Sequence, residues 1–257
     1  MKTRPNNRQG DVRRTAKQQG VALFVVIVLV MLSMLLALWS ARSALFGEII
    51  VGNDADYRRT FEAAQAMLQD AEFDIRGVRP DGSACVKDAT KPDQCRPPPA
   101  PSVTGAEVYF DFETKDLENM VSTIATKNAT VKCFKGICQK RSGSQDFWNE
   151  STTLSAMIAS DTGARYGQFT GADAKSTANP ILSNQTAEQG AWYWVEILPY
   201  VDANVALLGT LPAESNVLAF APSRKRPWVY RITALARGNK PNTEVVLQST
   251  LSIQIAE

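Results

Sequence analysis

Residues 21–39 read VALFVVIVLVMLSMLLALW, and no charged residue occurs between Lys17 and Arg42. At about 1.5 Å per residue, a helix over this stretch is about 28 Å long. That length matches the roughly 30 Å hydrocarbon core of a bilayer. The stretch therefore predicts a membrane-spanning helix.

A basic leader, residues 1–20, precedes this segment and carries a net charge of +5. Basic residues next to the start of a span stay in the cytoplasm, so we expect the N-terminus there and the C-terminal part on the far side. A secretory signal has a shorter apolar region followed by small residues at its cleavage site. Here the apolar region is longer, and Arg42 falls where that site requires small residues. An uncleaved signal anchor remains an alternative.

The helical pattern continues past the membrane segment to about Arg76. Charged residues fill most faces of this continuation, and we expect the acid pairs Asp54/Asp56 and Asp70/Asp74 to be solvated. Apolar residues recur at steps of three and four on one stripe: Ile50, Tyr57, Phe61, Ala64, Leu68, Ala71 and Ile75.

Glycines mark the weak points and the end of this helix. Gly47 and Gly52 each cost about 1 kcal/mol relative to alanine, so we expect a bend or local melting there. Gly77 predicts the C-cap. The sequence thus predicts four parts: the leader at 1–20, a membrane and assembly helix at 21–41, its amphipathic continuation at 42–77, and a head with disulfide loops at 78–257.

The strongest strand patterns lie near the C-terminus, at 191–198, 228–236 and 243–255. Alternating apolar residues give the last strand one face that packs on the helix. We therefore expect an α+β fold, in which a long N-terminal helix packs on a C-terminal antiparallel sheet. Weaker patterns predict strands at 107–112 and 130–134, helices at 117–126 and 153–160, and a polar surface segment at 161–190.

Four cysteines lie in the expected exported part and favour two disulfides. Three connectivities are open from sequence. We prefer Cys85 with Cys95 and Cys133 with Cys138, because short loops close at low entropic cost. A metal site is not expected, since the chain has no histidine and neither spacing is C-x2-C.

No arrangement for catalysis is recognised in the sequence. Without histidine, Ser-His-Asp and Cys-His sets are excluded, and neither a phosphate-binding loop nor a calcium loop occurs. Trp192 and Trp194 share one strand face, which we interpret as a buried core pair rather than a ligand platform. The whole chain carries +2, so residues 21–257 carry −3, which does not favour nucleic-acid binding. We predict a non-enzyme without cofactors.

The ends of the chain carry a family resemblance. The junction at residues 19–23, QGVAL, followed by the apolar run, resembles the leader junction of type IV pilins and pseudopilins. Residues 61–72, FEAAQAMLQDAE, resemble the helix motif of the minor pilin family PilX. Residues 230–234 and 242–250 resemble the C-terminal signature of that family. The chain is thereby identified as similar to PilX-type minor pilins of Gram-negative bacteria, with a type IV pilin-like fold.

The resemblance implies processing at the leader junction. A prepilin peptidase would cut between Gly20 and Val21, and Val21 would become the methylated N-terminus. Val21 departs from the phenylalanine or methionine usual in major pilins, and Val25 stands where most pilins have glutamate. A carboxylate in the bilayer is costly unless it is paired, and its pilus partner is taken to be the N-terminal amine of the subunit ahead. Val25 therefore motivates the hypothesis of a tip subunit; drift in a subunit that never enters the fibre is the alternative.

The implied function is assembly. The protein would prime type IV pilus assembly at the inner membrane with its C-terminal domain in the periplasm, join the fibre at its tip, and support adhesion and twitching motility. Implied partners are other minor pilins, the major pilin, a large pilus-tip adhesin and the prepilin peptidase. Alternatives are a type II secretion pseudopilin, an uncleaved bitopic periplasmic scaffold, and a membrane-tethered enzyme or ligand-binding module.

Overall fold

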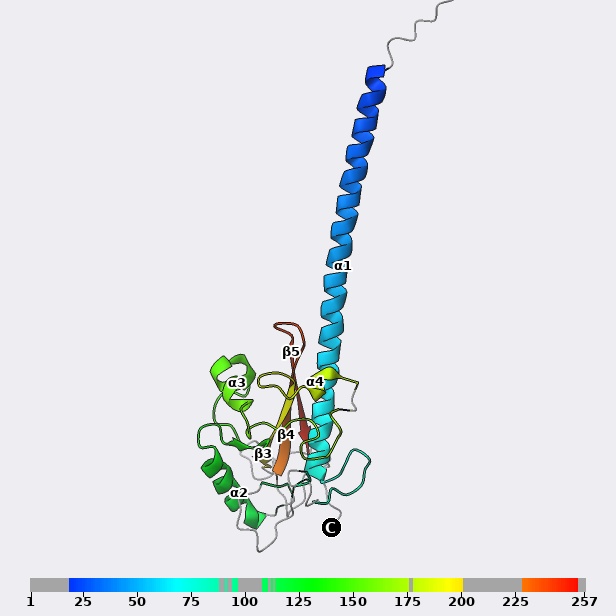
Figure 1. The fold of residues 1–257 in the computed structure, drawn as a ribbon. Coiled ribbons are helices and arrows are strands. Elements are labelled where there is room, and N and C mark those ends of the chain that lie inside the picture. Colours follow the sequence, from blue (N-terminus) through cyan, green and yellow to red (C-terminus); the bar gives the residue numbers. More distant parts are fainter. Residues whose placement is uncertain are drawn as a thin grey trace, which may run out of the picture. The chain divides into compact units, whose positions relative to one another are not determined.

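The computed structural model describes residues 19–87, 91, 94–96, 108–110, 112, 114–175, 178–200 and 228–253. The leader before Gln19 lies outside the described residues. The chain divides into two compact units, residues 1–53 and residues 54–257. Helix α1 (Gln19–Arg76) begins in the first unit and supplies the first element of the second (Figure 1).

The first unit contains the apolar part of α1. Its most apolar 18-residue window has a mean hydropathy of 3.2, which makes α1 long and apolar enough to cross a membrane. The helix continues through Gly47 and Gly52, so the local melting expected at these residues is not found. Packing does not require glycine at position 47, because a Cβ there would have nothing within 4 Å.

Helix α1 ends where the sequence predicts. Gly77 has φ +64°, the left-handed conformation that glycine adopts without strain. Its N–H donates to the Asp74 carbonyl (3.1 Å), and the Val78 N–H donates to the Phe73 carbonyl (3.0 Å). These two bonds form a Schellman motif, which confirms Gly77 as the C-cap.

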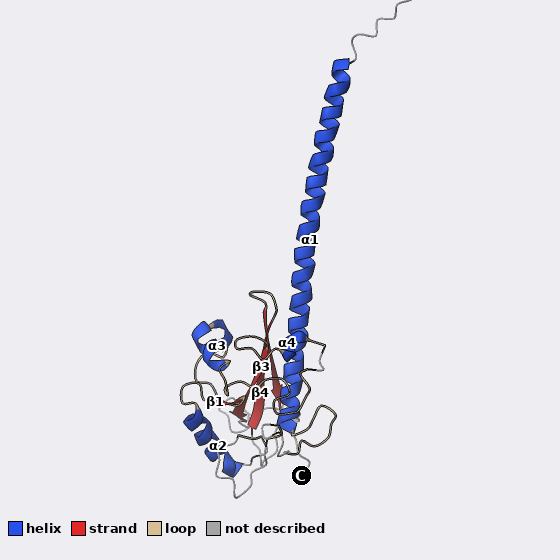
Figure 2. Cartoon of the chain, viewed as in Figure 1, coloured by secondary structure: helices blue, strands red, loops and turns tan. Residues whose placement is uncertain are grey.

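The second unit contains a five-stranded sheet in the order β1-β2-β3-β4-β5. Figure 2 draws its strands in red. Strands β3, β4 and β5 form an antiparallel meander, as expected, but β2 runs parallel to β3, pairing Ile137 with Val195. The sheet is therefore mixed rather than purely antiparallel. A connection of more than 50 residues separates the two parallel strands and returns the chain to the same end of the sheet. The bounds are β1 (Cys133–Phe134), β2 (Ile137–Gln139), β3 (Ala191–Pro199), β4 (Trp228–Arg237) and β5 (Glu244–Leu251).

Short helices complete the head: α2 (Thr114–Lys127), the 3-10 turn η1 (Phe147–Asn149), α3 (Ser151–Met157) and α4 (Pro180–Ser183). The helices expected at 117–126 and 153–160 are thereby confirmed with shifted ends. The strand expected at 107–112 is wrong for its described residues, none of which is in a strand. Their apolar side chains are buried by packing instead of by sheet pairing: the Phe112 ring stacks on Trp228 with centroids 4.6 Å apart.

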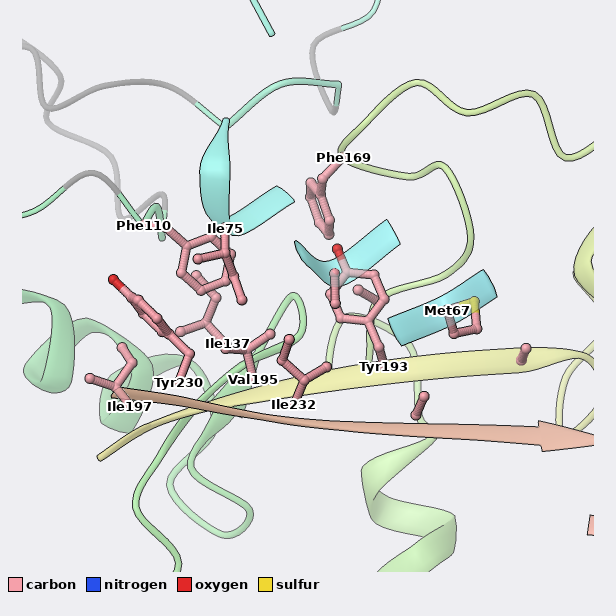
Figure 3. Close-up of a cluster of buried hydrophobic side chains, with 14 of the residues drawn as sticks. Met67, Ile75, Phe110, Ile137, Phe169, Tyr193, Val195, Ile197, Tyr230 and Ile232 are labelled. Carbon is pink, nitrogen blue, oxygen red and sulfur yellow. The ribbon is translucent and has the colours of Figure 1, made fainter. Parts of the chain in front are cut away.

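The sheet has a hydrophobic cluster on each face. On one face, the second half of α1 packs over residues such as Tyr193, Val195 and Ile232 (Figure 3). On the other, α3 covers Trp192 and Trp194. Both tryptophans are buried, and the Trp194 Nε1 donates to the Met157 carbonyl at 3.0 Å, which confirms the core pair.

The polar segment at 161–190 is not the surface excursion expected from its composition. Ala164, Phe169 and Ile181 from this segment are buried in the cluster between α1 and the sheet. Thr162 and Thr170 of the segment are buried as well. Backbone pairing of Ala164 with Tyr193 holds the segment against β3.

Candidate functional site

The first unit presents an extended apolar surface. Large apolar side chains from Val21 to Val51 are exposed along α1, with Val21 65% and Val25 47% exposed. The hydroxyl of Ser33 donates to the Val30 carbonyl at 2.9 Å, so the polar side chain in the middle of this segment is satisfied within the helix. An exposed apolar surface of this extent marks a site for lipid or for other apolar helices.

The residues of the expected processing site lie in the first turn of α1. Gly20 and Val21 are both helical, and Val25 follows Val21 at i+4 on the same helix face. No acidic residue occurs between Val21 and Gly47. The apolar segment therefore presents only valine at the position where a pilin glutamate is expected.

The second half of α1 carries acidic residues toward the core. Counted over the whole residue, Asp56, Asp70 and Asp74 are 3%, 2% and 6% exposed. The expectation of solvated carboxylates is therefore wrong for these three residues, although Asp54 is exposed in an ion pair with Arg58. The buried stripe differs from the one expected: Asp56, Thr60, Ala63, Ala64, Met67, Asp70, Ala71, Asp74 and Ile75.

Asp56 binds the turn between β4 and β5. Its two carboxylate oxygens accept the backbone N–H groups of Asn239 and Lys240, each at 3.1 Å. A Cβ at Gly238 would collide with the same carboxylate. One side chain of α1 thus satisfies two turn donors of the hairpin that closes the sheet.

Asp70 binds the segment that follows Ala164. It accepts the Gly167 N–H at 2.8 Å and the hydroxyl of Thr170. Burial raises the pKa of Asp70 from 3.8 to about 7, against the opposing effect of these two hydrogen bonds. The carboxyl group of Asp70 therefore titrates close to neutral pH.

Asp74 is the acceptor of a buried ion pair. The Nε of Arg96 lies 2.9 Å from both carboxylate oxygens, and the hydroxyl of Tyr193 donates to one of them at 2.7 Å. The side chains of Asp74 and Arg96 are 2% and 5% exposed. Burial raises the pKa of Asp74, while Arg96 and Tyr193 oppose that rise.

The Arg96 guanidinium has acceptors for its other nitrogens. Nη2 donates to the Lys135 carbonyl at 2.6 Å and Nη1 to the Val108 carbonyl at 3.3 Å. Its central carbon lies 3.6 Å from the centroid of the Phe169 ring. Because every guanidinium nitrogen is satisfied, the site stabilises a charged arginine at a depth where an unpaired cation is costly. We call Asp70, Asp74 and Arg96, with their partners Thr170 and Tyr193, the carboxylate socket.

The arrangement of these residues does not resemble a reaction centre. The described part of the chain contains no group of three or more potential metal ligands. The carboxylates of the socket accept hydrogen bonds from donors in the head. These bonds hold α1 against the head.

Comparison with known families agrees with the resemblance found in the two C-terminal motifs. Residues 134–253 match the family model for the type IV pilus assembly protein PilX, C-terminal part. Over these residues the chain belongs to the PilX family. No match was found among curated proteins or among solved structures.

The PilX match places the structure in a functional class. It extends from the end of β1 to just beyond β5, so it includes β2 to β5 and both C-terminal motifs noted in the sequence. The match supports a PilX-family type IV pilin that takes part in pilus assembly with other pilus components. The motif at 61–72 lies outside the match, on the part of α1 that packs on the PilX-type sheet.

Two disulfides stabilise the PilX-type head. They join Cys85 to Cys95 and Cys133 to Cys138, the connectivity preferred from sequence. The second closes the hairpin of β1 and β2, where Cys133 and Cys138 are paired. The first lies beside Arg96 of the carboxylate socket.

Sequence reasoning missed the socket, although a signal was present. Asp56, Asp70 and Asp74 are separated by 14 and 4 residues, close to whole turns of a helix, so they share one face. Ala63, Ala64 and Ala71 lie on the same stripe and indicate close packing. An acidic stripe interrupted by alanines is unusual for a solvated face and would have identified these carboxylates as buried.

Proposed function

We propose that this PilX-family protein is a minor pilin that primes pilus assembly at the inner membrane and occupies the fibre tip. The observation that carries the proposal is the exposed, acid-free apolar half of α1, on a chain whose C-terminal part is of PilX type. The leader keeps the N-terminus in the cytoplasm, residues 21–41 span the membrane, and residues 78–257 lie in the periplasm.

Cleavage between Gly20 and Val21 converts the anchored chain into a subunit. The prepilin peptidase removes the +5 leader, and Val21 becomes the methylated N-terminus. The freed apolar helix then leaves lipid by packing among equivalent helices of other subunits. Head-to-tail contacts of this kind do not close on themselves, so they propagate a filament. Ala22, Ala37, Ala41 and Ala44 permit close approach between helices.

Val25 is the basis for the tip position. A buried glutamate at this position needs a cationic partner, which the amine of the preceding subunit would supply. A subunit at the tip has no preceding subunit, so valine avoids an unpaired carboxylate in an apolar environment. The amine of Val21 remains available to the glutamate of the next subunit.

A position at the fibre tip implies which proteins this subunit contacts and what role it has. Other minor pilins and the major pilin pack against α1, and a large tip adhesin binds the head. Adhesion and twitching motility depend on the pili that this complex initiates. The type II secretion pseudopilin has the same leader, but the PilX match favours a pilus.

The first experiment determines the mature N-terminus by mass spectrometry of protein from membranes and from sheared fibres. A chain that begins at methylated Val21 supports the proposal. An intact junction between Gly20 and Val21, together with absence from fibres and from their initiating complex, contradicts it and favours the bitopic scaffold.

The second experiment tests the missing acid with Val25→Glu, and Val26→Glu is the matched control on a different helix face. If Val25 specifies the tip, Val25→Glu moves the protein into the shaft or lowers the number of pili. Val26→Glu lowers incorporation without redistributing the protein. Unchanged pilus number and position with Val25→Glu contradict the tip assignment.

A further inference from the structure

Arg96 is carried by a part of the chain with little secondary structure of its own. The described residues 94–96 belong to no helix or strand. The disulfide from Cys95 to Cys85 and the hydrogen bond from the Cys95 N–H to the Phe169 carbonyl, at 2.8 Å, hold these residues. The residue that neutralises Asp74 is therefore the immediate neighbour of a disulfide cysteine.

The other cysteine of this disulfide is attached to the end of α1. The Cys85 N–H donates to the carbonyl of Gly77, the C-cap residue, at 2.8 Å. The disulfide places the Cα of Cys95 5.1 Å from that of Cys85. Closing the bond thus shortens the path from the end of α1 to Arg96 and raises the local concentration of the guanidinium near Asp74.

The end of α1 needs this cation more than an ordinary helix end would. Asp70 and Asp74 lie one turn apart on the buried face. The groups that face them are the guanidinium of Arg96, the hydroxyl of Tyr193 from β3, and Thr170 and Gly167 from the segment beside it. Without Arg96, two acidic groups would be buried with neutral donors alone, which opposes docking of the helix.

We infer that closure of the Cys85–Cys95 disulfide and seating of Arg96 on Asp74 are one coupled step, so that oxidation of the head locks the last turns of α1 onto the sheet. The oxidant is a disulfide donor. One thiolate attacks the donor and releases its first thiol; the second thiolate then attacks the mixed disulfide and releases the other. Two cysteine thiols are oxidised, the donor is reduced to two thiols, and the thiol protons end on them.

The coupling is reciprocal by thermodynamic linkage. If the disulfide favours the ion pair, the ion pair must favour the disulfide by the same factor. The Cys133–Cys138 disulfide lies in a different cluster, against Met157 on the other side of the sheet. It serves as an internal reference for Asp74→Asn alone, because Arg96 donates to the Lys135 carbonyl in the turn that this disulfide closes. The inference concerns the head and does not depend on entry into a fibre.

The experiment measures the equilibrium between dithiol and disulfide for both cysteine pairs in the full chain. Detergent-solubilised protein is equilibrated in dithiothreitol redox buffers, the thiols are alkylated, and each pair is quantified by peptide mass spectrometry. The variants are Asp74→Asn and Arg96→Met. The control is Arg231→Met, which removes a partly buried ion pair with Glu196 from the opposite face of the sheet.

Coupling predicts that Asp74→Asn and Arg96→Met each lower the equilibrium constant for Cys85–Cys95 about tenfold or more. In Asp74→Asn, the constant for Cys133–Cys138 stays within about twofold of the wild type. Arg231→Met changes Cys85–Cys95 by less than about twofold. The inference is overturned if Cys85–Cys95 is unchanged in Asp74→Asn, or if both disulfides weaken equally in that variant. Asp74→Asn keeps the shape of the side chain, so it provides the decisive reading should Arg96→Met unfold the head.

Discussion

Asp74 on α1 and Arg96, 22 residues further along the chain, form an ion pair in which one guanidinium nitrogen lies 2.9 Å from both carboxylate oxygens. Both side chains are almost fully buried. The pair joins the last turns of α1 to the PilX-type head. Because the pair is buried, removal of one partner would leave an unpaired charge in the interior and lower the free energy of unfolding.

Loss of one partner of this pair is expected to destabilise the head. Arg96→Met leaves Asp74 buried without its cation, and such changes cost about 3–5 kcal/mol. Arg58→Met is the matched control, because Arg58 pairs with Asp54 at the surface, where pairs contribute about 0–1 kcal/mol. Denaturant unfolding of the detergent-solubilised chain, followed by tryptophan fluorescence, measures both values. Equal losses in the two variants would contradict the assignment.

Stability is expected to fall as the pH rises from about 4 to about 7. Burial raises the pKa of Asp70 to about 7 from the 3.8 expected in the unfolded chain. In this window the folded state binds the proton that the unfolded state has released, so the free energy of unfolding decreases with rising pH. The contribution reaches at most about 1.4 kcal/mol per pH unit.

Asp70→Asn removes the ionisable group and should therefore reduce the change of the free energy of unfolding with pH. Unfolding curves of the wild type and Asp70→Asn at pH 4.5, 6 and 8 give the two slopes, and Asp54→Asn is the exposed control. Burial also raises the pKa of Asp74, so a residual slope of the same sign is expected in Asp70→Asn. Parallel slopes for the wild type and Asp70→Asn would show that Asp70 ionises normally.

The turn between β4 and β5 is expected to loosen when Asp56 is shortened. Asp56→Ala leaves the N–H groups of Asn239 and Lys240 without their carboxylate, at a cost of about 1–3 kcal/mol. Hydrogen exchange at these two amides should accelerate more than elsewhere in the sheet. Asp54→Ala, two residues earlier and exposed, should leave both rates unchanged; acceleration with this control as well would argue against a specific contact.

Gly136 is expected to tolerate no side chain. It has φ +80°, and an added Cβ would lie 2.6 Å from the Cβ of Ala164. Gly136→Ala should therefore lower the free energy of unfolding by more than about 1 kcal/mol, since it adds backbone strain to a steric clash. Gly143→Ala should cost much less, because an added Cβ there would have nothing within 4 Å. The same unfolding assay tests both, and similar losses would remove the steric explanation.

Local pattern and composition determined a large part of this protein. The helix over the uncharged run after Lys17, the Gly77 cap, strands β3 to β5 with shifted ends, and the short-loop disulfides were predicted correctly, because each depends on neighbours within a few residues. The family resemblance came from motifs of the same kind.

Tertiary structure decided the direction of β2 beside β3 and the burial of the segment containing Phe169. It also decided that the carboxylates of Asp70 and Asp74 are buried. Helical spacing places them on one face with alanines, but the donors that make their burial favourable, Arg96, Thr170 and Tyr193, come from remote positions. Whether a carboxylate is buried depends on partners brought close by the fold, and helical periodicity carries no information about those partners.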